Sequence, residues 1–385
     1  MPPRIVWTTA AKNDLAANCC RLVPPVPHGE TELAIARDLQ RALCDETDVI
    51  VVRVYSGFRI RRDEYVLLLD TGHGDWIIKL AVPARLQAEY DALISATRIG
   101  FDGNQVFARM IPLPNGKEPL ALRYQTAESR IDLPNTKTLS DAFLSSVDYR
   151  YPTPESMGEV LRLLLDSVGS ECYRAAGPRS LLDADRRDIR LNPAANGGGH
   201  HYLSEALLPW TEGDPLEVRR NAIAAFPIRR DQPIFIDPVR MFQEIIDEIA
   251  ASSARLDALV PSALVGSAHG DLHGLNVRVG IEDNAASRPS LFDYENMSPD
   301  NLVAWDFVKL ETELKIRSYD RIWSRLKVRP YAWTIGRFES QLAQRTELHR
   351  HDNCWPTGGG SDPESRLQSL ILCIRGAAAR WLGRG

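Results

Sequence analysis

Three polar side chains lie close together in the segment 267–280, Ser-Ala-His-Gly-Asp-Leu-His-Gly-Leu-Asn-Val-Arg-Val-Gly. His269, Asp271 and Asn276 have the spacing H-x-D-x-x-x-x-N. An aspartate can accept the proton of a hydroxyl group, and an asparagine can offer its amide oxygen to a metal ion. The segment therefore predicts a loop that combines a proton acceptor with a metal ligand.

A second oxygen ligand follows this loop. Two short apolar runs, 277–280 and 289–292, are joined by a polar turn, which predicts an antiparallel hairpin. The start of the first strand then lies beside the end of the second, so Asn276 and Asp293 converge. Because Mg²⁺ takes one or two protein oxygens and completes its octahedron with water and phosphate oxygens, these two residues predict a magnesium site.

A single lysine, Lys79, stands in the apolar run Asp-Trp-Ile-Ile-Lys-Leu-Ala. On an edge strand such a lysine would reach water with its ammonium group. The following helix favours another interpretation, because Glu89 lies one turn beyond Leu86 on it. A strand lysine paired with a helix glutamate is the device by which protein kinases hold the α and β phosphates.

The elements that must position these residues change in character at Val49. An amphipathic pattern predicts one helix before it, at 30–44. After it come β-rich runs and a helix opened by Pro83, which together predict an antiparallel sheet with one helix. The strands are expected at 49–55, 64–70, 76–81 and 120–124, with the helix at 84–97. Further helices are expected at 139–147, 156–168, 238–250, 301–325 and 365–382.

These patterns predict an α+β fold class and divide the 385 residues into three parts. Residues 1–48 form an N-terminal helical extension, and 49–128 form a smaller part built on the sheet. Residues 129–385 form a larger helical C-lobe, which carries the loop around Asp271 and an insertion at about 175–237.

Composition narrows the class of protein. Hydrophobic residues make up 44% and charged residues 25%, as in ordinary soluble globular proteins. The net charge of −5 gives no overall field to attract a polyanion, so nucleic acid is not expected as a partner. The six cysteines form no C-x-x-C pair, and no apolar run is long enough for a signal peptide or a membrane span. We therefore expect a cytoplasmic protein with reduced cysteines and no membrane contact.

Three blocks together resemble the aminoglycoside phosphotransferase and choline kinase superfamily. They are His-Gly-Asp-Leu-His-Gly-Leu-Asn at 269–276, Leu-Phe-Asp-Tyr-Glu at 291–295, and Trp-Asp-Phe-Val-Lys-Leu-Glu at 305–311. The last block, continued to Lys315, also resembles the kinase-like domains named "ternary complex associated" in predicted bacterial conflict operons. The resemblance implies a bilobal protein kinase-like fold, in which 49–128 is the N-lobe that binds the nucleotide and 129–385 is the helical C-lobe. ATP, or GTP, and Mg²⁺ would bind in the cleft between the lobes.

The resemblance also assigns roles. Asp271 would deprotonate the hydroxyl of an acceptor, which is expected to be a small molecule, and Asn276 with Asp293 would hold Mg²⁺. Lys79, fixed by Glu89, would bind the nucleotide phosphates. His269 and Asp306 would support the loop, although Asp306 could also cap the helix that follows it.

Three further expectations follow from the same resemblance. Gly270 replaces the arginine with which many protein kinases contact a phosphorylated activation loop, so control of that kind is not expected. Adenine should bind the backbone after the strand 120–124, with Tyr124 near this hinge. Ser56 and Gly57 begin the turn that would cover the phosphates.

That turn departs from the family pattern, because Gly57 is its one glycine among residues 56–62. Two interpretations stay open. Arginines of the turn could supply the charge that backbone N–H groups supply elsewhere, in an active phosphotransferase. Alternatively, the chain is a degenerate kinase fold that serves as a nucleotide sensor or protein-binding module.

The composition of the insertion at 175–237 does not identify the acceptor. Its acids alternate with arginines, so it is not the dense acidic pocket that cationic aminoglycosides need. The pairs Arg219-Arg220 and Arg229-Arg230 are compatible with an acidic acceptor, with a protein partner, or with a solvated loop.

Overall fold

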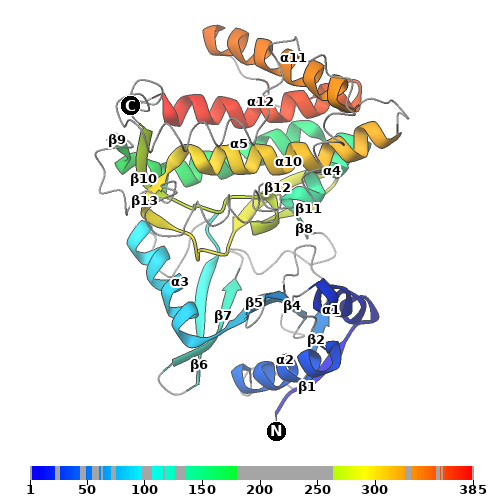
Figure 1. Cartoon of the computed structure of the whole chain (residues 1–385), viewed down its shortest axis with the longest axis vertical. Coiled ribbons are helices and arrows are strands. Elements are labelled where there is room, and N and C mark those ends of the chain that lie inside the picture. The colour runs from blue at the N-terminus through cyan, green and yellow to red at the C-terminus, as the bar shows by residue number, and fades with distance from the viewer. Residues whose placement is uncertain are drawn as a thin grey trace, which may run out of the picture.

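The computed structural model describes residues 2–21, 27–43, 49–53, 60–61, 64–70, 75–97, 106–115, 118–125, 136–179, 263–325, 331–352, 356 and 359–383. Figure 1 shows a lobe built around a sheet at one end and a lobe of long helices at the other. The predicted α+β class, with a sheet lobe followed by a larger helical lobe, is confirmed by this arrangement. The expected helix at 238–250 and most of the expected insertion at 175–237 lie outside the described residues.

One sheet forms the first lobe, with the strand order β1-β2-β4-β5-β7-β6. Its strands are β1 (Arg4–Trp7), β2 (Val49–Arg53), β4 (Glu64–Asp70), β5 (Asp75–Ala81), β6 (Arg109–Asn115) and β7 (Glu118–Gln125), and β3 (Ile60–Arg61) pairs with β4. Neighbours from β2 to β6 run antiparallel, and β1 runs parallel to β2. The four predicted strands are therefore confirmed, and the sequence interpretation missed β1, β3 and β6.

The two faces of this sheet pack against different helices. On one face, alternate residues such as Val66, Leu68 and Ile77 join a core with α3 (Pro83–Ala96) and the helical lobe. On the other face, Leu67 and Leu69 pack with residues of α1 (Thr9–Arg21) and α2 (His28–Ala42). Because β4 is covered on both faces, it is a continuous apolar run instead of an alternating one. The segment before residue 49 thus contributes a strand and two helices to this lobe.

The helical lobe consists of α4 (Leu139–Tyr149), α5 (Pro154–Glu171), α10 (Val303–Arg325), α11 (Tyr331–Asp352) and α12 (Pro363–Leu382). The side chains of Thr138, Thr153 and Asp362 accept hydrogen bonds from N–H groups of the first turns of α4, α5 and α12. Figure 1 shows α5, α10 and α12 lying side by side, with α11 at the outer end. No helix in the described ranges combines the length and the apolar character that crossing a bilayer requires.

Two small sheets lie between the helices and the first lobe. One contains β8 (Thr136–Thr138), β11 (Val277–Glu282) and β12 (Ala285–Leu291), and the other contains β9 (Gly177–Arg179), β10 (Ala263–Ala268) and β13 (Ser298–Leu302). The hairpin of β11 and β12 pairs Val277 with Leu291 and confirms the predicted hairpin. The segment 269–276 links β10 to β11, so both small sheets hold its ends.

Candidate active site

A buried carboxylate holds the loop that carries Asp271. The Asp306 carboxylate accepts hydrogen bonds from the backbone N–H groups of His269 and Gly270, each at 2.8 Å, and from the Tyr173 hydroxyl at 2.9 Å. Burial raises the pKa of Asp306 above its ordinary value, and these three hydrogen bonds limit the rise. Asp306 lies inside the first turn of α10, which begins at Val303, so it is not the N-cap residue.

Gly270 is required by the shape of this loop. Its φ of 75° lies in the left-handed region, and a Cβ atom there would be 2.3 Å from the carbonyl oxygen of Asn296. The Asn301 side chain closes the other side, because its Nδ2 donates to the carbonyl oxygens of Asn296 and Ala268 at 2.9 and 3.1 Å. The backbone geometry therefore excludes an arginine at this position, as it excludes any other residue with a side chain.

Inside the loop, two side chains fix the backbone around Asp271. His269 Nδ1 accepts from the Asp271 N–H at 3.3 Å, and His269 Nε2 lies 3.3 Å from the carbonyl oxygen of Phe292. These two contacts fit a neutral imidazole that carries its proton on Nε2. Asn276 Nδ2 donates to the carbonyl oxygen of Asp271 at 3.1 Å. The three residues of the H-x-D-x-x-x-x-N spacing are thus joined to one another through the backbone of Asp271.

The hairpin brings Asp293 to this loop. The N–H of Phe292 donates to the carbonyl oxygen of Asn276 at 3.0 Å, so Asn276 lies beside the residue that precedes Asp293. Asp293 has a φ of 65°, in the left-handed region that aspartate and asparagine tolerate better than other residues with side chains. From this turn its Oδ1 lies 3.0 Å from Nζ of Lys79, which belongs to the other lobe.

Lys79 lies on a central strand, between β4 and β7, and its side chain is 1% exposed. The edge-strand interpretation is therefore wrong. Its Nζ is surrounded by four carboxylates, at 2.7 Å from Glu89, 3.0 Å from Asp293, 3.1 Å from Glu295 and 3.4 Å from Glu64. Burial lowers the pKa of Lys79, but the four carboxylates raise it more, so Lys79 is a fixed cation.

Glu89 reaches Lys79 from the buried face of α3, which it shares with Leu86 and Leu93. Its Oε1 accepts from the Tyr124 hydroxyl and, at 2.8 Å, from the N–H of Tyr294. Burial raises the pKa of Glu89 to about 7, against the opposing effect of Lys79. The predicted pair of Lys79 and Glu89 is therefore in direct contact.

Tyr124 was expected near the adenine. Its side chain is buried, and its ring lies 5.9 Å from that of Phe292 and 6.0 Å from that of Tyr294. The Tyr124 ring thus packs in the core, and its hydroxyl donates to Glu89. That the backbone at this position binds adenine stays a prediction, and residues 126–135, which follow directly, lie outside the described ranges. Ser56 and Gly57 lie outside them as well.

The sequence interpretation missed several charged residues of the site. Glu64 and Glu295 contact Lys79, and Arg85 bridges them, with its Nη1 2.7 Å from Glu64 and its Nε 3.3 Å from Glu295. On the other side of the site, Nζ of Lys309 contacts Oδ1 of Asp271. Strand alternation could have found Glu64, because it lies two residues before Val66, the partner of Lys79 in β4, and so shares its face.

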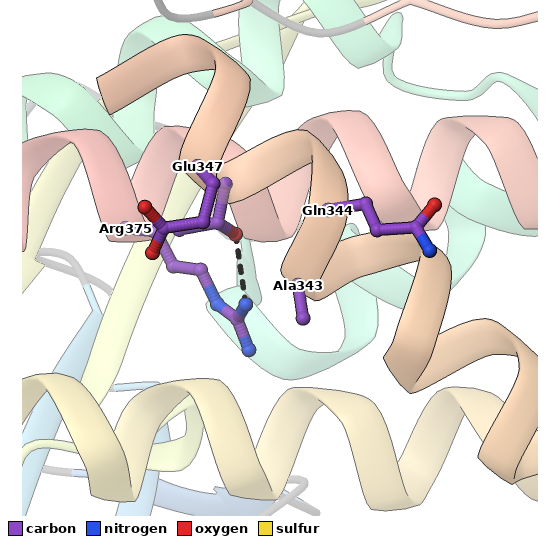
Figure 2. Close-up of a pocket in the computed structure, with 5 residues that line it drawn as sticks. Ala343, Gln344, Glu347 and Arg375 are labelled. Atoms are coloured by element: carbon purple, nitrogen blue, oxygen red, sulfur yellow. Dashed lines mark hydrogen bonds between the residues drawn. The ribbon is translucent and has the colours of Figure 1, made fainter. Parts of the chain in front are cut away.

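The described residues include no group of three or more His, Cys, Asp or Glu side chains arranged to hold a metal ion by themselves. A separate pocket of about 360 Å³ lies between α11 and α12. Figure 2 shows Arg375 and Glu347 among the residues that line this pocket. Nη1 of Arg375 donates to the Thr346 hydroxyl at 2.8 Å. None of the residues predicted for the site lines this pocket.

Parts of this chain are similar in sequence to known proteins. The family model described as ternary complex associated domain 9 matches residues 167–383. An uncharacterised protein of Deinococcus radiodurans is 26% identical over 150 residues, which are 38% of this chain and 42% of that relative. The aligned part thus spans less than half of that relative.

Two crystal structures of thermostable mutants of aminoglycoside phosphotransferase APH(4)-Ia are similar to the chain. The apo form is 11% identical, with a TM-score of 0.35, over 85% of this chain and 96% of that chain. A ternary complex with AMP-PNP and hygromycin B is also 11% identical, with a TM-score of 0.37, over 88% of this chain and 97% of that chain.

Proposed function

We propose that this chain, which belongs to the ternary complex associated domain 9 family, is an ATP- and Mg²⁺-dependent phosphotransferase with a hydroxyl acceptor. One observation carries the proposal. Nζ of Lys79 lies within 3.0 Å of both Glu89 and Asp293, so the lysine and glutamate of the sheet lobe meet the loops of the helical lobe. Protein kinases use this connection to place the phosphates of ATP beside the catalytic aspartate.

On the nucleotide side, Lys79 would bind phosphate oxygens while Glu89 holds it in place. The described charged groups here are four carboxylates, of Glu64, Glu89, Asp293 and Glu295, and two cations, Lys79 and Arg85. This excess of carboxylates favours binding of a divalent cation together with the polyphosphate.

Asp293 and Asn276 would hold that cation. Asn276 uses its Nδ2 in the bond to Asp271, which leaves the amide oxygen for a ligand, and Asp293 supplies a carboxylate. Oxygen donors of these two kinds fit Mg²⁺, and the low number of protein ligands fits an ion that also binds phosphate and water. When bound, the ion would neutralise charge that develops on the phosphate oxygens.

Asp271 would orient the acceptor hydroxyl and accept its proton. The acceptor oxygen forms a bond to the γ-phosphorus while the bond from that phosphorus to the β,γ-bridging oxygen breaks, and ADP leaves. Most of the rate enhancement would come from positioning and electrostatics, because the loop around Asp271 is held by Asp306, His269 and Asn276.

The proposal is tested by ATP hydrolysis in the absence of an acceptor. A complete site transfers the phosphoryl group slowly to water, so the wild-type protein should hydrolyse ATP only with Mg²⁺, and Asp271→Asn should abolish this activity. Asp38→Asn, the same change of charge on α2, serves as the matched control. Hydrolysis no higher in the wild type than in Asp271→Asn would instead favour a degenerate kinase fold that acts as a sensor or protein-binding module.

A further inference from the structure

Lys309 lies at the entrance to Asp271. It is located on α10, three residues after Asp306, and therefore on nearly the same face of the helix. Its Nζ contacts Oδ1 of Asp271. The Lys309 side chain is 34% exposed, whereas that of Asp271 is 9% exposed, so Lys309 is the solvent-facing member of the pair.

A histidine lies beside this ion pair, and its Nδ1 accepts from the N–H of Leu275 at 3.2 Å. His273 Nε2 lies 3.7 Å from the same oxygen of Asp271. The acid one turn further along α10 is used elsewhere: Glu313 accepts from the Ser140 hydroxyl at 2.7 Å and from the Gly274 N–H at 3.1 Å, and it also pairs with Arg317. Within the described ranges, Asp271 is the one carboxylate in ion-pair contact with Lys309.

A hydroxyl acceptor must compete with Lys309. To be deprotonated, its oxygen must come within hydrogen-bond distance of the Asp271 carboxylate, where Nζ of Lys309 now lies. Lys309 is exposed enough to be displaced, but its ammonium group then loses its one ionic partner among the described residues. Leaving a half-buried charge without a partner is unfavourable, and an anion on the acceptor would restore the pair.

We propose that Lys309 is a specificity residue that selects acceptors with an anionic group, a phosphate or a carboxylate, close to the reacting hydroxyl. The inference rests on the proposed function, because it concerns the acceptor side of the same site. It predicts the opposite of an aminoglycoside site, since a cationic acceptor would place a like charge beside Lys309. An anionic acceptor would exchange one partner of Lys309 for another and leave Asp271 available to the hydroxyl.

The test measures binding of matched compounds to the full chain saturated with Mg²⁺ and the non-hydrolysable nucleotide AMP-PNP. Each set shares one carbon skeleton and differs in charge: glycerol 3-phosphate, glycerate, glycerol and 3-amino-1,2-propanediol, then glucose 6-phosphate, gluconate, glucose and glucosamine. We expect an anionic member to bind at least about tenfold more tightly than its neutral and cationic counterparts. The phosphate and carboxylate arms identify which anion is selected.

Variants connect this preference to the residue. Lys309→Met should weaken binding of the preferred anion about tenfold or more, and Lys309→Arg should largely retain it. Arg321→Met removes the same charge from an exposed position further along α10 and should leave the affinity unchanged. In turnover, Lys309→Met should raise KM for the acceptor and leave KM for ATP unchanged.

Three results would overturn the inference: a neutral or cationic member that binds best, no binding of any anionic member, or an affinity that Lys309→Met does not change. Each of these presupposes that AMP-PNP and Mg²⁺ bind. A protein that fails to bind them contradicts the proposed function itself, so the two failures are distinguishable.

Discussion

Lys79 and Asp271 occupy opposite electrostatic surroundings in one site. Lys79 is a buried cation, 1% exposed, surrounded by four carboxylates from β4, α3 and the loop after β12. Asp271 is a carboxylate that pairs with Lys309 and lies 3.7 Å from Nε2 of His273. The side proposed for the nucleotide is therefore acidic around a lysine, and the side proposed for the acceptor pairs an aspartate with a lysine.

The difference has a chemical consequence on each side. Excess carboxylate around Lys79 would be neutralised by the divalent cation proposed to bind with the nucleotide, whereas the partly exposed ammonium of Lys309 would be neutralised by the anion proposed on the acceptor. Mobility differs as well. Lys79 has four partners and is enclosed, so it is preorganised, whereas Lys309 has one ionic partner in the described structure and can be displaced.

The largest effect is expected for a substitution of Asp271, the proposed proton acceptor. Asp271→Asn removes the proton acceptor while keeping the shape of the side chain, so turnover should fall about 10³-fold. The free energy of unfolding should change little, because the loop is held by the backbone contacts of Asp306. Steady-state kinetics alongside a urea unfolding curve measure both quantities, and turnover equal to that of the wild type would remove Asp271 from the mechanism.

The next largest effect concerns the loop of the acceptor side. Gly270→Ala forces a side chain into the left-handed region and against the carbonyl of Asn296, so it should destabilise the fold by about 3 kcal/mol. The matched control is Gly336→Ala, in the interior of α11, where a Cβ meets no atom within 4 Å. That change should stabilise the protein by about 1 kcal/mol. Equal effects of the two substitutions in denaturant unfolding would show that the loop is not constrained as described.

On the nucleotide side, Asp293→Asn should keep the fold and weaken binding of ATP with Mg²⁺. Asparagine tolerates the φ of 65° at this position, but it removes the charged ligand. We expect about 100-fold weaker binding, or about 2.7 kcal/mol, by isothermal titration. Binding in EDTA should be weak for the wild type and the variant alike. An unchanged affinity in the variant would place the metal elsewhere.

The smallest effect is a dependence of stability on pH that arises from Glu89. Burial raises the pKa of Glu89 from 4.5 to about 7, so folding favours its protonated form. The stability that this preference contributes is complete below pH 4.5 and is lost as the pH rises to about 7. The full shift corresponds to roughly 3 kcal/mol, and relaxation around the buried group should reduce it to about 1 to 2 kcal/mol.

The corresponding measurement is the free energy of unfolding at several pH values between about 4.5 and 8 for the wild type and for Glu89→Gln. The wild type should lose stability relative to the variant over the lower part of this range. Parallel curves would mean that Glu89 is ionised throughout, and that the acidic surroundings of Lys79 carry their full charge below about pH 7.

The residues that the sequence revealed were those that local spacing connects. His269, Asp271 and Asn276 lie on one loop. Two apolar runs and a turn predict the hairpin that carries Asp293. Glu89 lies on α3, the element that directly follows the strand of Lys79. In each case, the contact depends on elements that are adjacent in the chain or paired by a short turn.

Long-range contacts were not visible in the sequence. Asp271 and Lys309 are brought together because α10 packs against the loop 269–276. The periodicity of the sequence does not specify which lysine of α10 contacts Asp271. The contact of Glu295 with Lys79 could not be predicted from the sequence either, because it forms only where the two lobes meet.

Three elements that the sequence interpretation missed have identifiable physical causes. Strand β6 contains Pro112 and Pro114, which disfavour a strand but are tolerated at the edge position that it occupies. Helix α11 was missed because its apolar stripe is sparse, with Thr334, Phe338 and Leu342 as its buried positions among the residues described for it. Strand β1 is short, and its partner β2 lies far along the chain, beyond two helices.

The most direct test of the account is the thermal stability of the protein with and without nucleotide and Mg²⁺. Wild-type protein in ATP with Mg²⁺ at about 100 times the dissociation constant should gain about 2.7 kcal/mol. The gain should disappear in EDTA and in Asp293→Asn, whereas Asp38→Asn should keep it. Asp293→Asn is preferable to removal of Lys79, which would leave the surrounding carboxylates without their shared cation. A wild-type melting curve that does not respond to saturating ATP with Mg²⁺ or to GTP with Mg²⁺ would contradict the account.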